Sequence, residues 1–169
     1  RVGLGEQIQA RLGFIPAEPR EPRPLDAVDL PPARLAPPAS LPFARADRED
    51  RVRHTYGRSY PEIVRGFLGD FSPAPDVVLH PATEAELSAG LDWAAGAGAA
   101  VVPFGGGTSV VGGVTLARAD RPPVVVIDTR ELSALLDVDA TSRLARIGAG
   151  AGGPELERAL GAHGLTLRC

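Results

Sequence analysis

Residues 101–114 read VVPFGGGTSVVGGV, and five glycines fall within nine positions of this stretch. Glycine loses more conformational freedom on folding than other residues, so such a cluster needs a structural reason. Without Cβ atoms, successive backbone N–H groups can turn toward one anion, and Thr108 and Ser109 add hydroxyl donors. The valine pairs on both sides are typical of strands rather than of a linker. We therefore interpret the stretch as a phosphate-binding loop, with a mobile glycine-rich loop as the alternative.

Composition and charge bound the class of protein. A length of 169 residues allows one domain with its own core, and a net charge of −3 argues against a nucleic-acid-binding surface, which needs a clustered basic face. Lys, Asn and Met are absent, a bias typical of a GC-rich bacterial genome. Because the sequence has no Met and begins with Arg1, we expect an N-terminal fragment or a processed chain.

Other features bear on location and on metal binding. The single cysteine, Cys169, cannot form an internal disulfide, which fits a reducing compartment. The uncharged span between Asp92 and Arg118 is interrupted by Pro103 and seven glycines, so we expect no transmembrane helix. We predict a cytoplasmic protein, with peripheral membrane association of the full-length protein as an open alternative. The histidines show no metal-site spacing, and we expect no metal.

Residues 1–46 form the first of three predicted parts, a proline-rich extended segment. Gly5–Leu12 predicts a short helix, and the prolines that follow exclude regular structure. Spaced apolar residues predict that the segment lies extended over another surface, with a disordered linker as the alternative. These residues are Leu25, Val28, Leu30, Leu35 and Leu41.

Residues 47–70 are predicted to form a helical lead-in. Pro61 and Glu62 indicate the start of a helix, and Gly69 indicates its end. Three apolar residues of this helix are expected to face inward: Ile63, Val64 and Phe67. His54 lies in a charged run, and we interpret it as a solvated or capping residue, with contact to a ligand as the alternative.

Residues 71–169 carry the pattern of an α/β lobe. A strand is predicted at Val77–His80 and another at Ala100–Pro103, and between them Thr83 and Glu86 have the spacing of a helix capping box. This order predicts a βαβ unit with parallel strands, and residues 124–128 are typical of a central strand. The expected apolar stripe of the helix is Leu87, Leu91, Ala94 and Ala95. The remaining predicted elements are strands at Leu132–Val138 and Ser142–Ile147 and a helix from Pro154 to His163.

Three kinds of phosphate loop compete for these glycine-rich sequences. A P-loop requires a Lys after its last glycine, and the chain has none. The dinucleotide-binding pattern G-x-G-x-x-G occurs at Gly148, Gly150 and Gly153, after a predicted strand and before a predicted helix. Several strands precede it, however, and the acidic residue expected about 20 positions later would lie beyond Cys169. The alternative role of these glycines is to bring the helix close to the sheet.

The third kind is a flavin loop, and here the sequence resembles a known family. Residues 103–109, followed by a second glycine pair, resemble the pyrophosphate loop of the vanillyl-alcohol oxidase/p-cresol methylhydroxylase (PCMH-type) FAD-binding family, and residues 75–81 and 148–157 resemble its flanking blocks. The resemblance implies an α+β fold, in which residues 71–169 are the first α/β lobe of an FAD-binding domain that is incomplete at its C-terminus. The residues that it assigns to cofactor binding are Pro103, Phe104, Gly105, Gly106, Gly107, Thr108 and Ser109.

The same resemblance bears on how the cofactor is held and on the reaction. Members with covalently bound flavin have His where this sequence has Thr108, so non-covalent FAD is implied. Residues 51–57 and 66–71 are similar to alkylglycerone-phosphate synthase and its bacterial relatives. That subgroup implies an FAD-dependent enzyme of ether-lipid synthesis, which exchanges the acyl chain of acyl-dihydroxyacetone phosphate for a fatty alcohol. Its catalytic residues would lie beyond Cys169, so none is assigned here.

Two other functions stay open at this point. The same loop serves FAD-linked oxidases and dehydrogenases of 2-hydroxy acids such as glycolate and D-lactate. The second alternative is that the chain alone is a non-catalytic module without flavin, because half a cofactor site binds weakly. We expect the parent protein to be a flavoenzyme with a small-molecule or lipid substrate. Exposed apolar edges of this chain predict self-association, with a homodimer as one form.

Overall fold

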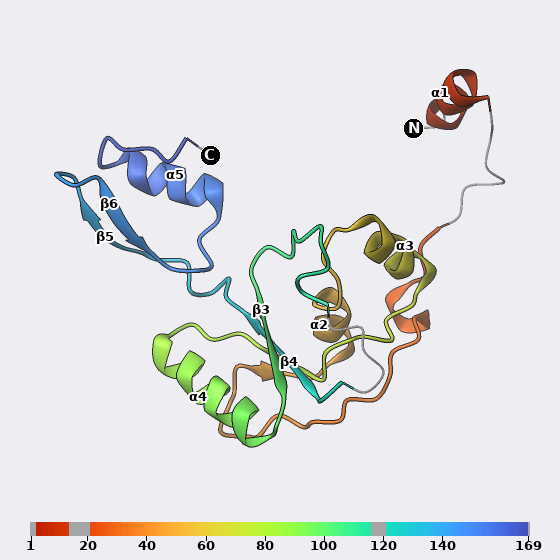
Figure 1. The fold of residues 1–169 in the computed structure, drawn as a ribbon, viewed down its shortest axis with the longest axis horizontal. Coiled ribbons are helices and arrows are strands. Elements are labelled where there is room, and N and C mark those ends of the chain that lie inside the picture. Colours follow the sequence, from red (N-terminus) through yellow and green to blue (C-terminus); the bar gives the residue numbers. More distant parts are fainter. Residues whose placement is uncertain (1–2, 14–20, 116–120, 169) are drawn as a thin grey trace.

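The computed structural model describes residues 3–13, 21–115 and 121–168. Figure 1 shows a small sheet with helices on both of its faces, and a separate hairpin with one helix beside it. The elements and their bounds are α1 (Gly3–Leu12), the 3-10 helix η1 (Leu25–Ala27), β1 (Ala44–Arg45), α2 (Arg48–Arg53), α3 (Tyr60–Leu68), β2 (Val77–Leu79), α4 (Glu84–Gly96), β3 (Ala100–Phe104), β4 (Val124–Asp128), β5 (Leu135–Asp139), β6 (Leu144–Ile147) and α5 (Gly153–Gly161).

The four-stranded sheet has the order β1-β2-β4-β3. β4 pairs in parallel with β2 on one side and with β3 on the other, while β1 pairs antiparallel with β2 at the edge. The predicted central strand is therefore confirmed, and it separates the two strands of the βαβ unit. All five residues of β4 are buried, as expected for a strand that is covered on both faces.

The core lies on both faces of this sheet. One face packs Val77, Leu79, Val125 and Ile127 against Ala94 of α4. The opposite face carries the alternate residues, Val78, Val102, Phe104, Val124 and Val126. α2 lies over this second face, on the opposite side from α4 (Figure 1). The alternation of side chains along each strand thus sets which residues face α2.

The capping prediction for α4 is confirmed, but one part of its predicted apolar stripe is wrong. The Thr83 hydroxyl accepts a hydrogen bond from the backbone N–H of Glu86 at 3.2 Å. Leu91 is exposed, whereas Gly90 and Ala94 face the sheet. A Cβ atom on Gly90 would lie 2.7 Å from a methyl group of Leu79. The close approach of the helix at Gly90 rotates Leu91 away from the core.

The prediction that the apolar residues of α3 face inward is also wrong. Ile63, Val64 and Phe67 are 51%, 37% and 38% exposed. The side of α3 that packs inward carries Glu62 and Gly66, one turn apart. The helix starts and ends where expected, and the structure adds a capping box at Ser59 and a left-handed conformation at Gly69. Local signals therefore gave the bounds of α3 correctly but not its orientation.

Beyond the sheet, β5 and β6 form an antiparallel hairpin, and α5 follows it. Both strands and the helix fall within or close to their predicted ranges. Leu160 of α5 is buried and Leu156 is partly buried, which agrees with the predicted inward face. Within the described ranges, no helix has the length and apolar character needed to cross a membrane.

The proline-rich segment lies over the sheet as predicted, and Arg34 fixes it there. Val28 and Leu41 are buried, although Leu25 is 40% exposed. The Arg34 guanidinium donates to both oxygens of Asp76, at 3.1 Å from Nε and 2.7 Å from Nη2. Asp76 precedes β2 and also accepts from the backbone N–H of Val124 at 2.7 Å. One buried carboxylate therefore joins the segment to the amino ends of two strands.

Asp76→Asn is expected to lower the free energy of unfolding by about 2 kcal/mol, because the buried carboxylate then no longer provides a charged acceptor for Arg34 and the Val124 N–H. Urea unfolding followed by circular dichroism measures the effect. The control is Asp92→Asn on the exposed side of α4, which should change stability by less than about 0.5 kcal/mol. Equal effects of the two substitutions would contradict the role given to Asp76.

Candidate cofactor site

The carboxyl ends of the three parallel strands meet at one edge of the sheet. His80 follows β2, Gly105 follows β3, and Asp128 is the last residue of β4. Phe104 pairs with Asp128 in the register of the sheet. Ligands of open α/β sheets bind outside the carboxyl ends of the strands. The predicted glycine loop therefore leaves the sheet at the edge where a ligand is expected.

The first glycines of the loop turn over the ring of Phe104. Gly107 has φ +64°, in the left-handed region, and a Cβ there would lie 2.5 Å from Cζ of Phe104. A side chain at this position would displace the ring, and only glycine adopts the turn without strain. The backbone N–H of Thr129 donates to the Phe104 carbonyl at 2.9 Å, which ties the start of the loop to the end of β4.

The far part of the loop is fastened to the segment between α2 and α3. The backbone N–H of Arg58 donates to the Ser109 carbonyl at 2.6 Å. A Cβ on Gly57 would overlap that same carbonyl oxygen. The Thr115 hydroxyl contacts the Thr55 carbonyl at 3.1 Å and the Glu62 carboxylate at 2.6 Å. These contacts favour a shaped loop over the mobile alternative.

Glu62 links these contacts of the loop to the start of α3. One of its oxygens accepts from the Ser59 backbone N–H at 3.1 Å, while the other accepts from Thr115. Burial raises the pKa of Glu62, but hydrogen bonds from Ser59 and Thr115 outweigh it and hold the pKa below its ordinary value. The ionised carboxylate thus caps the helix and holds the end of the glycine loop at once.

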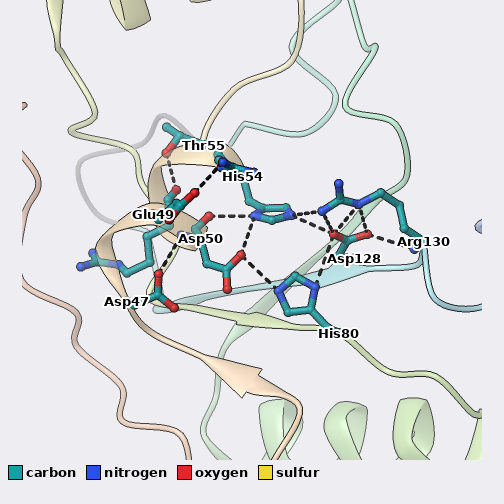
Figure 2. Close-up of polar contacts among 10 residues, drawn as sticks. Asp47, Glu49, Asp50, His54, Thr55, His80, Asp128 and Arg130 are labelled. Atoms are coloured by element: carbon teal, nitrogen blue, oxygen red, sulfur yellow. Dashed lines mark hydrogen bonds and ion pairs between the residues drawn. The ribbon is translucent and has the colours of Figure 1, made fainter. Parts of the chain in front are cut away.

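A buried polar cluster lies at the end of β4, and Figure 2 shows its members around Asp128. His54 Nε2 lies 3.0 Å from Asp128 Oδ2, and its Nδ1 donates to the Asp50 carbonyl at 2.7 Å. His80 Nδ1 lies 3.5 Å from the same Asp128 oxygen, and its Nε2 lies 3.3 Å from Oδ1 of Asp50. Arg130 completes the cluster with an ion pair to Asp128.

The charges of this cluster are set by mutual contact. Burial raises the pKa of Asp128, but hydrogen bonds from His54, His80 and Arg130 outweigh it and hold the pKa far below its ordinary value. The hydrogen bond to Asp128 raises the pKa of His80, and the nearby Asp50 adds to the effect against the opposing cost of burial. Asp128 is therefore an anion with several cationic or donor partners.

His54 is the capping residue at the end of α2, as one half of the sequence prediction had it, but the other half, a solvated side chain, is wrong. Its side chain is 1% exposed, and its ring packs edge-on against Phe104 with centroids 4.7 Å apart. The charged residues around His54 suggested an exposed side chain. His54 ends α2 on the side that faces the sheet, however, where Asp128 accepts from its ring. Asp128 and Arg130 were not singled out from the sequence either. Among the residues that the structure describes, no group of His, Cys, Asp and Glu has the arrangement of a metal site.

A polar cleft of about 270 Å³ lies between the glycine loop and the segment that fastens it. Gly106 and Gly107 form one wall, and the ring of Phe104 lies at the base with His54. Three arginines and no carboxylate line the cleft: Arg53, Arg58 and Arg130. In a chain of net charge −3, this local excess of positive charge favours an anionic ligand.

The second glycine pattern serves packing. A Cβ on Gly148 would overlap the carbonyl oxygen of Leu132, and one on Gly150 would overlap that of Thr129. The strand that precedes these glycines is β6 of the antiparallel hairpin, not a parallel strand of the main sheet. The glycines therefore allow the backbone after β6 to lie directly on the backbone after β4.

Comparison with known proteins decides between the candidate loops. The family described as "FAD binding domain" matches residues 75–169. The chain belongs to this family. Its cofactor is FAD, and the glycine-lined, arginine-rich cleft has the donors that a diphosphate requires. The α+β architecture predicted from the sequence is confirmed, and the dinucleotide-binding and P-loop alternatives are set aside.

Several curated relatives and two solved structures carry the same name. The chain is 32% identical over 121 residues to an alkyldihydroxyacetonephosphate synthase of Dictyostelium discoideum and 32% identical over 124 residues to one of Trypanosoma brucei brucei, covering 72% and 73% of the chain. It spans 20% of the length of either relative. Two solved structures of alkyldihydroxyacetonephosphate synthase match 98% of the chain and 33% of their own length, with TM-scores of 0.83 and 0.84 and identities of 26% and 27%.

Gly57→Ala is expected to lower the free energy of unfolding by about 1–3 kcal/mol, because the added methyl group must displace the Ser109 backbone. Chemical denaturation measures this loss. Gly161→Ala is the matched control, since a Cβ at the end of α5 meets no atom of the described chain within 4 Å. If both variants were as stable as the parent chain, the loop would not be fastened at Gly57.

His80→Asn is expected to have a pH-dependent effect on stability. The pKa of His80 is raised in the folded chain, so its contribution is complete below the ordinary histidine pKa of about 6.5 and is lost as pH rises through the folded value. The difference in unfolding free energy between parent and variant should therefore shrink as the pH rises above about 6.5 and through the raised pKa of His80. Groups common to both proteins cancel in this difference, and a constant difference would contradict the prediction.

Proposed function

We propose that this chain is the FAD-binding part of an enzyme with alkyldihydroxyacetonephosphate synthase activity. Such an enzyme exchanges the acyl chain of acyl-dihydroxyacetone phosphate for a fatty alcohol. The observation that supports it best is the agreement along nearly the whole chain with two synthase structures at TM-scores above 0.8. The similarity extends through the proline-rich segment and the helical lead-in, which precede the residues that match the family.

The proposed cofactor-binding residues are the seven positions from Pro103 to Ser109. Gly106 and Gly107 line the cleft, and Phe104 forms its base. Ser109 is held by its backbone contact with Arg58, and its hydroxyl accepts from the Gly113 N–H at 2.9 Å. Pro103 and Thr108 are exposed, which favours a role in shaping the loop for Pro103 and a role as a donor for Thr108. Bound flavin supplies the redox-active ring, and these residues orient its diphosphate.

The proposal includes three finer points. FAD is bound without a covalent link, because Thr108 lacks a ring nitrogen that could attach to it. The chain divides into the proline-rich extended segment at residues 1–46, the helical lead-in at 47–70 and the first part of the FAD-binding domain at 71–169. A lipid substrate and self-association fit the exposed apolar face of α3, on which Ile63 and Phe67 lie.

The purified chain mixed with FAD and then gel-filtered is expected to retain absorbance bands near about 370 and 450 nm, the bands of oxidised flavin. Acid precipitation should release the flavin into the supernatant, because the link is not covalent. Flavin in the washed pellet would contradict non-covalent binding. A full-length protein without flavin would contradict the whole proposal.

The reaction is tested with the full-length protein. Incorporation of a labelled long-chain alcohol into product, dependent on acyl-dihydroxyacetone phosphate, is the expected result. Reduction of a dye by glycolate or D-lactate, without incorporation of alcohol, would favour the 2-hydroxy-acid dehydrogenase alternative instead.

A further inference from the structure

Arg130 is an exposed arginine with a fixed orientation. It follows β4, and its side chain is 57% exposed. Its Nε contacts both oxygens of Asp128, at 3.0 and 2.7 Å, and its Nη2 contacts Oδ2. The backbone N–H of Arg130 also donates to Asp128 Oδ1 at 3.0 Å. The planar guanidinium is thereby held against a planar carboxylate, so it loses little further freedom when it binds a ligand.

The carboxylate that holds Arg130 is itself fixed by the core. Asp128 is 1% exposed and ends a strand that is paired on both sides. His54 and His80 contact its Oδ2 atom from α2 and from the end of β2. A chain of contacts therefore leads from the buried sheet to the guanidinium, as Figure 2 shows.

The guanidinium lies at the cleft beside the glycine loop. Arg130 lines this cleft together with Gly106, Gly107 and Arg58. In the part of the chain that the structure describes, the contacts of the guanidinium involve Nε and Nη2, which leaves Nη1 for a ligand oxygen. Asp128 is balanced by three partners, so the positive charge of Arg130 is not consumed by one ion pair.

We propose that Arg130 binds the diphosphate of FAD together with the glycine loop, and that Asp128 is the positioning residue that directs the guanidinium there. This inference rests on the proposed FAD site at residues 103–109. The loop supplies neutral backbone donors, and Nη1 of Arg130 adds a charged donor, which suits a group with two negative phosphates.

The test is the affinity of the full-length protein for FAD, measured by the change in flavin fluorescence for the unsubstituted protein, Arg130→Gln and Arg130→Lys. The Gln variant should bind FAD about tenfold more weakly, because hydrogen bonds between charged groups are worth more than one between neutral groups. The Lys variant should lose less FAD affinity than the Gln variant, since it keeps the charge but not the planar guanidinium that Asp128 orients. Binding by the Gln variant should also be less sensitive to salt and to competition by inorganic pyrophosphate.

Arg158→Gln on α5 is the matched control. Arg158 is also more than half exposed and paired with a carboxylate, that of Glu155 at 3.0 Å, and it does not line the cleft. Its substitution should leave FAD affinity unchanged. Equal FAD affinity of Arg130→Gln and the parent would overturn the inference and leave the proposed function standing. A full-length protein that binds no FAD would instead overturn the proposed function.

Asp128→Asn tests the positioning role. It should weaken FAD binding in the same direction as Arg130→Gln, and the double variant should lose little more than the single ones. Thermal unfolding of each variant identifies any that fails to fold. If the two losses simply add, Asp128 does not act through Arg130.

Discussion

The parallel pairing of β4 between β2 and β3 is the constraint on which the rest of this structure depends. The strand comes last of the three in the chain and takes the middle place in the sheet. Its residues are buried on both faces, so its backbone groups must be satisfied by its two neighbours. Once β4 is in place, the carboxyl ends of three strands share one edge, and the loops that follow them meet there.

Both ends of β4 contact a buried carboxylate, but the two carboxylates have different partners. At the amino end, Asp76 is held by Arg34 and by the backbone of Val124, and the contact closes the proline-rich segment over the sheet. At the carboxyl end, Asp128 is held by two histidines and one arginine. Burial of a carboxylate is unfavourable unless it is paired and hydrogen-bonded, so each end of β4 requires its own set of partners. Asp76 is enclosed by the proline-rich segment, while Asp128 lies beside the cleft.

The parts of this fold that the sequence predicted are those with local signals. The glycine loop, the bounds of α3, the capping box of α4 and the buried run of β4 each depend on residues a few positions apart. The contact of His54 with Asp128 joins residues 74 positions apart, and no local pattern reveals it. The orientation of α3 was mispredicted for a related reason, because the neighbours of a helix decide which face it buries. The loop was thus identified from the sequence, while the charges around it required the fold.

The fastening of the glycine loop bears on where this domain begins. The family match starts at residue 75, yet the groups that hold Ser109 and Thr115 come from residues 55–62. An expression boundary placed at the start of the match would remove Arg58, Glu62 and His54, and with them one wall of the cleft. The sequence that defines the family and the sequence that completes its binding site are therefore not the same segment. Homologues that vary before residue 75 can be expected to vary in the shape of the loop, even where the loop itself is identical.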